Sequence, residues 1–294
     1  MQTIGWENVN VSQDKREAWL VTALSGPHLL CEAGVFSLWK LVQLLGNAKH
    51  AALVQGLLDY PDIVAAHCDL LTLTVRCCCH PELARIHLQD RLPVKVTVEV
   101  QSLGKTSVTL VSRVLKTSSL HSDTVLVTSR TVLVNISRRS GRPVPLPATA
   151  LEPVELEGTG KGRQTGSGVS EQFSAGFDEI PVSADNYDVT VVSSDTIAGH
   201  TNEASYVRYC FGGANNTRRH HPVSKSASAF KQLEVQYCGQ SMTGDRLKVL
   251  SWQRPSFPDT TCYVIKRLFG IGDDVIVRAV GTYHEQNRVP MSSL

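Results

Sequence analysis

The chain has 294 residues, a net charge of +2 and 42% hydrophobic residues, enough to build one large domain or two of ordinary size. The net charge is near neutral, and no basic stripe is interleaved with aromatic residues. The sequence therefore lacks the charge pattern that is usual for a nucleic-acid-binding protein. The sequence also has no run of about eighteen apolar residues, so no membrane span is predicted.

The first residues lack the charged-then-apolar pattern of a secretory leader, so we expect a cytoplasmic protein.

Eight cysteines without a disulfide-scaffold spacing are expected to be thiols. The run 77–80, Cys-Cys-Cys-His, invites a metal interpretation. Because successive strand residues point to opposite faces, these side chains cannot easily converge on one tetrahedral ion. We therefore predict neither a metal site nor a cofactor.

The first half is predicted to be a helix followed by an antiparallel meander. From Ala33 apolar residues recur at helical spacing, and the helix is expected to reach about Leu58 with a break near Gly46 or Gly56. Pro61 should end it, because proline disfavours helical geometry in the residue before it. The stretch 6–24 could form a first strand. Further strands are expected near 70–79, 92–100, 106–115 and 124–136.

A change of composition separates the two halves. Prolines cluster after residue 143 and glycines follow them, which is typical of a flexible linker. We therefore divide the chain into an N-terminal domain, 1–147, a linker, 148–184, and a C-terminal domain, 185–294.

The second half repeats the first in outline. A strand at 187–192 leads through a polar turn to a helix expected from Glu203 to about Phe211. Strands follow near 230–237, 246–253, 262–269 and 274–283. A short similarity between 26–33 and 199–204, each preceding the helix of its half, supports an internal duplication.

The polar turn before the second helix carries the candidate catalytic residues Asp195, His200 and Asn202. A helix N-terminus has unpaired N–H groups and the positive end of the helix dipole. These groups would favour a carbonyl that is becoming an oxyanion. Each residue also has a structural interpretation, since Asp195 or Asn202 could cap the helix and His200 could fix the turn.

Several segments resemble one known family. Residues 101–110, 131–137 and 141–147 resemble the sheet of a hotdog-fold thioesterase, and 199–206 resembles the start of its central helix. The chain as a whole is similar to double-hotdog acyl-CoA and acyl-ACP thioesterases of the 4-hydroxybenzoyl-CoA thioesterase type. The resemblance implies an α+β fold of two tandem hotdogs, each a central helix wrapped by a curved antiparallel sheet. It also implies an acyl-thioester site between them.

The resemblance further implies roles for the turn. Members of this family carry an acid three residues before the glycine of the Gly-His-x-Asn run, where this chain has Thr196. Asp195 would take that role if the turn is one residue longer, while His200 and Asn202 would orient water or the carbonyl. Four further residues are expected to bind the substrate: Thr201, Glu203, Tyr206 and Glu32.

The leading hypothesis is an acyl-thioester hydrolase of lipid metabolism, acting on acyl-CoA or acyl-ACP. Two alternatives remain open at this point. One is a hotdog protein that binds acyl thioesters without hydrolysing them, and the other is a dehydratase that acts on a β-hydroxyacyl thioester through a histidine and an acid. The partners expected are the acyl-thioester substrate and neither nucleic acid nor membrane, and a homodimer is left open.

Overall fold

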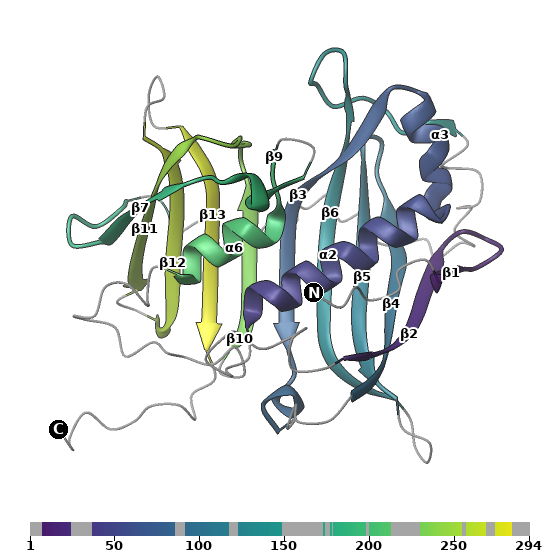
Figure 1. Cartoon of the computed structure of the whole chain (residues 1–294), viewed down its shortest axis with the longest axis horizontal. Coiled ribbons are helices and arrows are strands. Elements are labelled where there is room, and N and C mark those ends of the chain that lie inside the picture. Colours follow the sequence, from purple (N-terminus) through teal and green to yellow (C-terminus); the bar gives the residue numbers. More distant parts are fainter. Residues whose placement is uncertain are drawn as a thin grey trace, which may run out of the picture.

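A computed structural model describes residues 8–24, 37–85, 92–117, 123–148, 173, 177, 179–197, 200–212, 230–254, 257–268 and 274–283. These residues form an 11-stranded antiparallel sheet with two central helices, α2 (Leu38–Val54) and α6 (Glu203–Gly212), packed on one face (Figure 1). In the described part of the chain, no helix has both the length and the apolar character needed to cross a bilayer.

The N-terminal half of the sheet surrounds α2. Its strand order is β1-β2-β4-β5-β6-β3. The strands are β1 (Asn10–Val11), β2 (Glu17–Leu24), β3 (Cys68–Cys79), β4 (Leu92–Leu103), β5 (Ser107–Lys116) and β6 (Thr124–Ser137). The 3-10 turns η2 (Leu57–Asp59) and η3 (Pro81–Arg85) and the short helix α3 (Tyr60–Ala65) complete this half.

The C-terminal half has the same plan around α6, with the order β10-β13-β12-β11-β7. Its strands are β7 (Asp185–Thr190), β10 (Phe230–Tyr237), β11 (Arg246–Arg254), β12 (Phe257–Arg267) and β13 (Val275–Tyr283). In each half, the strand before the helix lies at an outer position and the strand after the helix lies at the junction. This equivalence supports the duplication inferred from the sequence.

The two halves join through one strand pair. β3 and β10 run antiparallel in register, with Val75 opposite Val235 and Cys77 opposite Leu233. The sheet is therefore continuous across the junction, and α2 and α6 contact one another above it (Figure 1).

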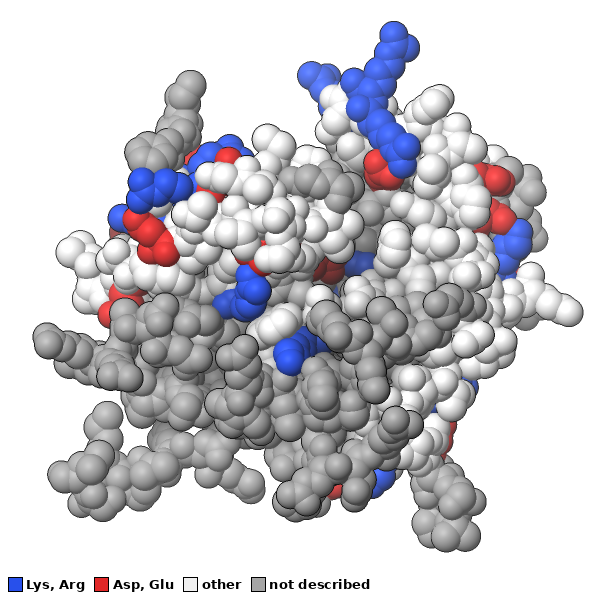
Figure 2. Space-filling model, in the orientation of Figure 1, with Lys and Arg blue, Asp and Glu red and all other residues white. Residues whose placement is uncertain are grey.

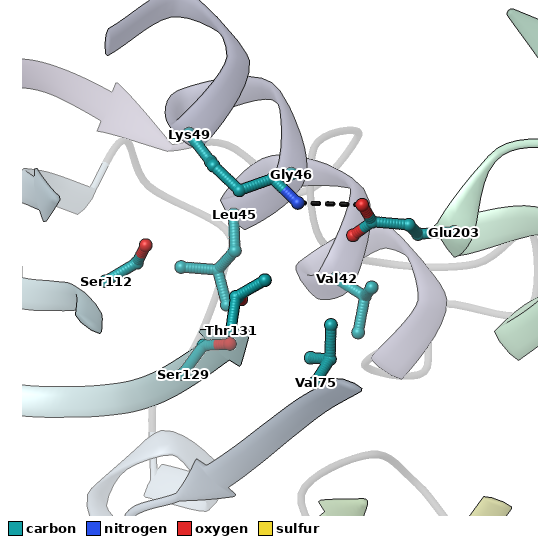
Figure 3. A pocket seen from close by; sticks show the side chains of 9 residues that line it. All are labelled: Val42, Leu45, Gly46, Lys49, Val75, Ser112, Ser129, Thr131 and Glu203. Carbon is teal, nitrogen blue, oxygen red and sulfur yellow. Dashed lines mark hydrogen bonds and ion pairs between the residues drawn. The ribbon is translucent and has the colours of Figure 1, made fainter. Parts of the chain in front are cut away.

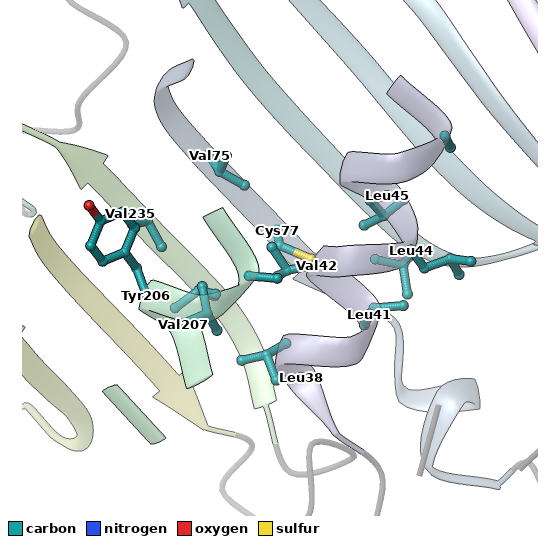
Figure 4. Close-up of a cluster of buried hydrophobic side chains, with 14 of the residues drawn as sticks. Leu38, Leu41, Val42, Leu44, Leu45, Val75, Cys77, Tyr206, Val207 and Val235 are labelled. Carbon is teal, nitrogen blue, oxygen red and sulfur yellow. The ribbon is translucent and has the colours of Figure 1, made fainter. Parts of the chain in front are cut away.

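A shared apolar core fixes both helices to the sheet. Figure 4 shows Leu38 and Val42 of α2 together with Val207 of α6, and these side chains belong to one buried cluster. Full burial of a leucine or valine side chain stabilises a fold by about 1.5–3 kcal/mol. Since side chains from both halves enter this cluster, the position of one helix depends on the other.

Most predicted strands agree with the structure to within a few residues, but the end of the first helix differs. α2 ends at Val54, and Gly56 then adopts a left-handed conformation with φ of 105°. Pro61 lies in the first turn of α3, where a missing N–H costs nothing. The expected break near Gly56 is therefore confirmed, whereas the expectation that the helix reaches Leu58 and is ended by Pro61 was wrong.

The predicted linker contains anchored residues. Phe173 and Phe177 are buried against Trp252, Cys262 and Val264 in a second cluster on the C-terminal half of the sheet. The ring centroids of Phe173 and Phe177 lie 5.0 Å apart, and Phe177 meets Trp252 edge-on at 6.0 Å. Residues 149–172 lie outside the described residues, so the predicted flexibility applies to a part that the structure does not describe.

Charged side chains are mixed on the face seen in Figure 2. Lysine and arginine lie singly or beside aspartate and glutamate among the described residues, and most of the visible described surface is uncharged.

Candidate active site

The polar turn before α6 is held together by its own hydrogen bonds. It consists of the 3-10 turn η5 (Ser193–Asp195) and two short strands, β8 (Thr196–Ile197) and β9 (His200–Thr201), that pair with one another. The backbone N–H of Asn202 donates to the carbonyl of Asp195 at 2.9 Å, and the Asn202 side-chain amide donates to the same oxygen at 2.8 Å. These bonds close the turn and fix the direction in which α6 begins.

Asn202 is the N-cap of α6. Its Oδ1 accepts a hydrogen bond from the backbone N–H of Ser205 at 2.8 Å, which satisfies one of the unpaired donors of the first helical turn. With both ends of its amide engaged, Asn202 stabilises the turn and the helix together.

Asp195 is buried, with 2% of its surface exposed. It forms an ion pair with Arg208 and accepts a 2.5 Å hydrogen bond from the Tyr209 hydroxyl. Burial, together with the hydrogen bond to Asp195, raises the pKa of Tyr209 well above its ordinary value. The Arg208 guanidinium also lies 5.8 Å from the ring centroid of Trp39 in α2. Asp195 therefore links the turn to α6 and, through Arg208, to the other half.

Thr201 and Tyr206 meet a buried serine on the C-terminal half. The Ser241 hydroxyl lies 2.7 Å from Thr201 Oγ1 and 2.9 Å from the Tyr206 hydroxyl. The Ser241 N–H donates to the Tyr206 hydroxyl at 2.8 Å. This network attaches the turn to the connection between β10 and β11. The two residues expected to bind substrate are thus engaged within the protein.

His200 lies on the surface of the same turn. Its side chain is exposed, and its backbone bridges to Met242. The structure shows no hydrogen bond from the imidazole to another described residue, so Asp195 and His200 do not form an acid–base pair here.

Glu203 points away from the turn towards the N-terminal half. Lys49 of α2 donates from Nζ to Glu203 Oε1 at 2.7 Å (Figure 3). It also donates to Thr72 Oγ1 at 3.0 Å. The Thr72 hydroxyl donates to the same carboxylate oxygen. The Lys49 side chain is only 9% exposed and that of Glu203 28%. A largely buried ion pair thus spans the two halves.

A small pocket lies beside this ion pair, under α2 (Figure 3). Its enclosed part has room for about one water molecule, since most of the surrounding space of about 260 Å³ is open solvent or gaps between atoms. Helix α2 covers it with Val42, Leu45 and Gly46, β3 adds Val75, and the ion pair closes one side. The sheet below contributes three hydroxyl side chains, Ser112, Ser129 and Thr131.

Register explains why the three hydroxyls lie together. Ser112 of β5 is directly opposite Ser129 of β6, and Thr131 is opposite Val75 of β3. Paired residues share one face of a sheet, and alternate residues of a strand return to it. Gly46 borders the space above them, and a Cβ atom at Gly46 would meet nothing within 4 Å.

Sequence reasoning found only part of this pocket. Glu203 lines it, but Glu32 lies outside the described residues. Tyr206 lies in α6 against Ser241, and the other predicted residues belong to the turn. The sequence analysis did not predict Lys49, Thr72 or the hydroxyl row, which is formed by Ser112, Ser129 and Thr131. Lys49 did carry a signal, because it follows Leu45 by four residues on the apolar face of the helix, where a lysine is unexpected.

The cysteine run behaves as strand alternation predicts. Cys77 and Cys79 are buried and Cys78 between them is exposed. The structure places no group of three metal-ligating side chains together among the described residues.

Comparison with known proteins gives the fold. No protein-family model matches the chain, and no curated protein matches its sequence. Among solved structures, an acyl-ACP thioesterase from Bacteroides thetaiotaomicron is similar with a TM-score of 0.63 and 14% identity, over 93% of this chain and 100% of that one. A 12:0-ACP thioesterase from Umbellularia californica is similar with a TM-score of 0.66 and 10% identity, over 94% and 99%. Together with the strand order, this likeness confirms the tandem hotdog fold.

Proposed function

We propose that the chain hydrolyses acyl thioesters of coenzyme A or acyl carrier protein at the pocket between its halves. The observation that carries this proposal is the position of Glu203. It is the first residue of α6, it lines the pocket, and it meets Lys49 and Thr72 of the opposite half. The solved structures of similar fold bear the names of thioesterases, which supports the same class of substrate.

The start of α6 is suited to polarising the thioester carbonyl. The amides of Glu203 and Ala204 are in the first helical turn and have no acceptor among the described residues. Their N–H groups and the positive end of the helix dipole would stabilise the oxyanion of a tetrahedral intermediate.

Glu203 is the proposed general base. Its Oε1 accepts from Lys49 and Thr72, whereas Oε2 has no hydrogen bond to another described residue. In the proposed reaction Oε2 takes a proton from water as the water oxygen bonds to the carbonyl carbon. The intermediate then collapses, the carbon–sulfur bond breaks, and the carrier leaves as a thiolate that receives the proton.

The turn supports this chemistry in two ways. Asp195 and Asn202 are proposed as positioning residues, because their contacts fix the start of α6. The exposed His200, three residues before Glu203, is proposed to relay the proton that Glu203 took from water to the departing thiolate. Thr201 and Tyr206 hold the turn through Ser241.

Replacement of the carboxylate tests the proposal. Glu203→Gln keeps the size of the side chain and removes its basicity, so thiol release from acyl-CoA and acyl-ACP should fall by about 10²–10⁴-fold. Glu99→Gln is the matched control, because Glu99 forms a 2.7 Å ion pair with Arg113 away from the pocket and should keep the parent rate. Full activity of the Glu203→Gln enzyme would exclude Glu203 as the base.

A second candidate function is binding without hydrolysis. The observation that favours it is the engagement of Asp195 and Asn202 within the protein. Absence of thiol release above background, with a rise in melting temperature on adding acyl-CoA, would select this function over hydrolysis.

A further inference from the structure

We infer that the enclosed space under α2 is a binding site for a single water molecule, and that this water is the one that attacks the thioester. The presence of the water follows from the size and the walls of the space. Its reaction rests on the proposed function and deepens it, because it states where the nucleophile of the hydrolysis lies.

The enclosed space matches a water molecule in size. It has room for about one water, and Val42, Leu45 and Val75 confine it on its apolar sides. An acyl group, which is a chain of carbon atoms, does not fit there. Even methanol, which exceeds water by one methyl group, would have to displace one of these side chains.

The floor of the water site supplies hydrogen-bond partners. Ser112 and Ser129 are each 2% exposed and Thr131 is 5% exposed. Their hydroxyls make no hydrogen bond to another described residue, and all three side chains border the space (Figure 3). A buried polar group without a partner costs about 1–3 kcal/mol. A buried water makes about three hydrogen bonds, and each hydroxyl can both donate and accept, so this floor favours a bound water.

The charged side of the water site favours an uncharged ligand. Lys49 and Glu203 both border the space, and their ion pair balances the two charges. Within the described structure Lys49 uses one of its three N–H donors for Glu203 Oε1 and one for Thr72 Oγ1. The third is available to the water oxygen. Because Lys49 repels a cation and Glu203 repels an anion, water is preferred over either kind of ion.

Glu203 brings this water next to the reacting carbonyl. Its backbone N–H is one of the donors proposed for the oxyanion, and its side chain borders the water site. The water oxygen bonds to the carbonyl carbon while its proton passes to Oε2. The carbon–sulfur bond then breaks, and the departing thiolate takes up the proton, which leaves a carboxylic acid and a thiol. The acyl chain and the carrier therefore lie on the open side of the space.

Competition between water and methanol tests the water site. The acyl-CoA that the parent enzyme cleaves fastest is incubated in buffer containing methanol, and the free acid and the methyl ester are quantified. A methanol that attacks gives its hydroxyl proton to Glu203 and yields the methyl ester and the thiol. A close-fitting site rejects one additional methyl group by about tenfold or more. The ester fraction should therefore lie well below that of alkaline, enzyme-free cleavage in the same solvent.

A matched pair of variants ties this selectivity to the water site. Val75→Ala removes two methyl groups from the wall of the site and should raise the ester fraction severalfold. Val96→Ala makes the same change in β4, at a position that is 1% exposed and does not border the space, and should keep the ester fraction of the parent. Both variants create a cavity and lose stability, so melting temperatures establish that each is folded during the assay.

Removal of one hydroxyl gives a second measurement. Thr131→Val keeps the volume of the side chain and removes a partner of the water, so kcat should fall by about threefold to tenfold, the effect of one hydrogen bond. KM should stay unchanged, because the hydroxyl contacts the water and not the thioester. Thr109→Val is the control. Leu110 lies opposite Thr131, so the neighbouring Thr109 points to the other face of the sheet, and this variant should keep the kcat of the parent.

The outcomes separate the inference from the proposed function. An ester fraction equal to that of the enzyme-free reaction, or an unchanged kcat in Thr131→Val, overturns attack from this site and leaves hydrolysis standing. If the parent cleaves no thioester, the proposed function fails and the reaction of this water fails with it. A crystal structure at atomic resolution then decides the water site alone: an ordered water within hydrogen-bond distance of Ser129 and Thr131 supports it, and no electron density there overturns it.

Discussion

At the scale of single residues, neighbouring side chains of the turn serve different halves of the molecule. Asp195, Thr201 and Asn202 hold the turn to itself, to α6 and to Ser241. Glu203, the next residue, reaches across to Lys49. A helix N-cap orients the residues after it, so Asn202 determines where the Glu203 carboxylate lies.

Asn202→Ala should therefore cost about 1 kcal/mol of unfolding free energy, the usual effect of removing a cap. It should also reduce thiol release, because the start of α6 loses its fixed direction. Asn202→Asp keeps an acceptor for the Ser205 N–H and is expected to lose less stability. Urea unfolding of the three proteins measures the difference, and an alanine variant as stable as the parent contradicts the capping role.

At the scale of elements, the pocket depends on a glycine in the middle of α2. Gly46 faces the hydroxyl row across open space. Glycine in a helix interior is less stable than alanine by roughly 0.5–1 kcal/mol, so this residue reduces the stability of α2 and leaves the space beside it open.

Gly46→Ala should accordingly raise the unfolding free energy by about 0.5–1 kcal/mol while lowering kcat/KM for acyl thioesters, because the methyl group narrows the space beside Glu203. Gly56→Ala provides the contrast, because Gly56 has φ of 105° and alanine is strained there. That variant should be less stable than the parent and keep the kcat/KM of the parent. A Gly46→Ala enzyme with unchanged kinetics would show that the methyl group does not reach the substrate.

Elements and site differ in how far the sequence predicts them. The strand at 92–100 was predictable because alternation of valine with polar residues is a local property, and it appears within β4 (Leu92–Leu103). The Lys49–Glu203 pair joins residues 154 positions apart, and the hydroxyl row depends on the register of β5, β6 and β3. Neither follows from local spacing, so the sequence predicts the turn but not the pocket.

At the scale of the whole molecule, buried tyrosines link stability to alkaline pH. The pKa values of Tyr237, Tyr263 and Tyr283 are raised chiefly by burial, and that of Tyr209 by burial and Asp195. A raised pKa in the folded state means that the unfolded chain releases its proton first. The stabilisation is complete below about pH 10, the ordinary tyrosine pKa, and is lost as pH rises above it.

The unfolding free energy should therefore fall between about pH 9.5 and 11, a range that brackets the ordinary tyrosine pKa of about 10. Urea titrations across the range, with tyrosinate absorbance followed in parallel, measure this fall. Tyr209→Phe removes one of the four groups and should flatten the curve in part, at the cost of the hydrogen bond to Asp195. Constant stability to pH 11 would contradict the burial of these hydroxyls.

Because β3 pairs with β10, one sheet runs through both halves, and this has a consequence for how the site assembles. The Lys49 ammonium and the Glu203 carboxylate come from different halves of a duplicated architecture, yet they are carried by one polypeptide. Their meeting is therefore an intramolecular event, governed by an effective local concentration that the connecting segment sets. Dilution does not separate them. The pocket between the halves thus persists at protein concentrations at which two separate hotdog chains of modest affinity would dissociate.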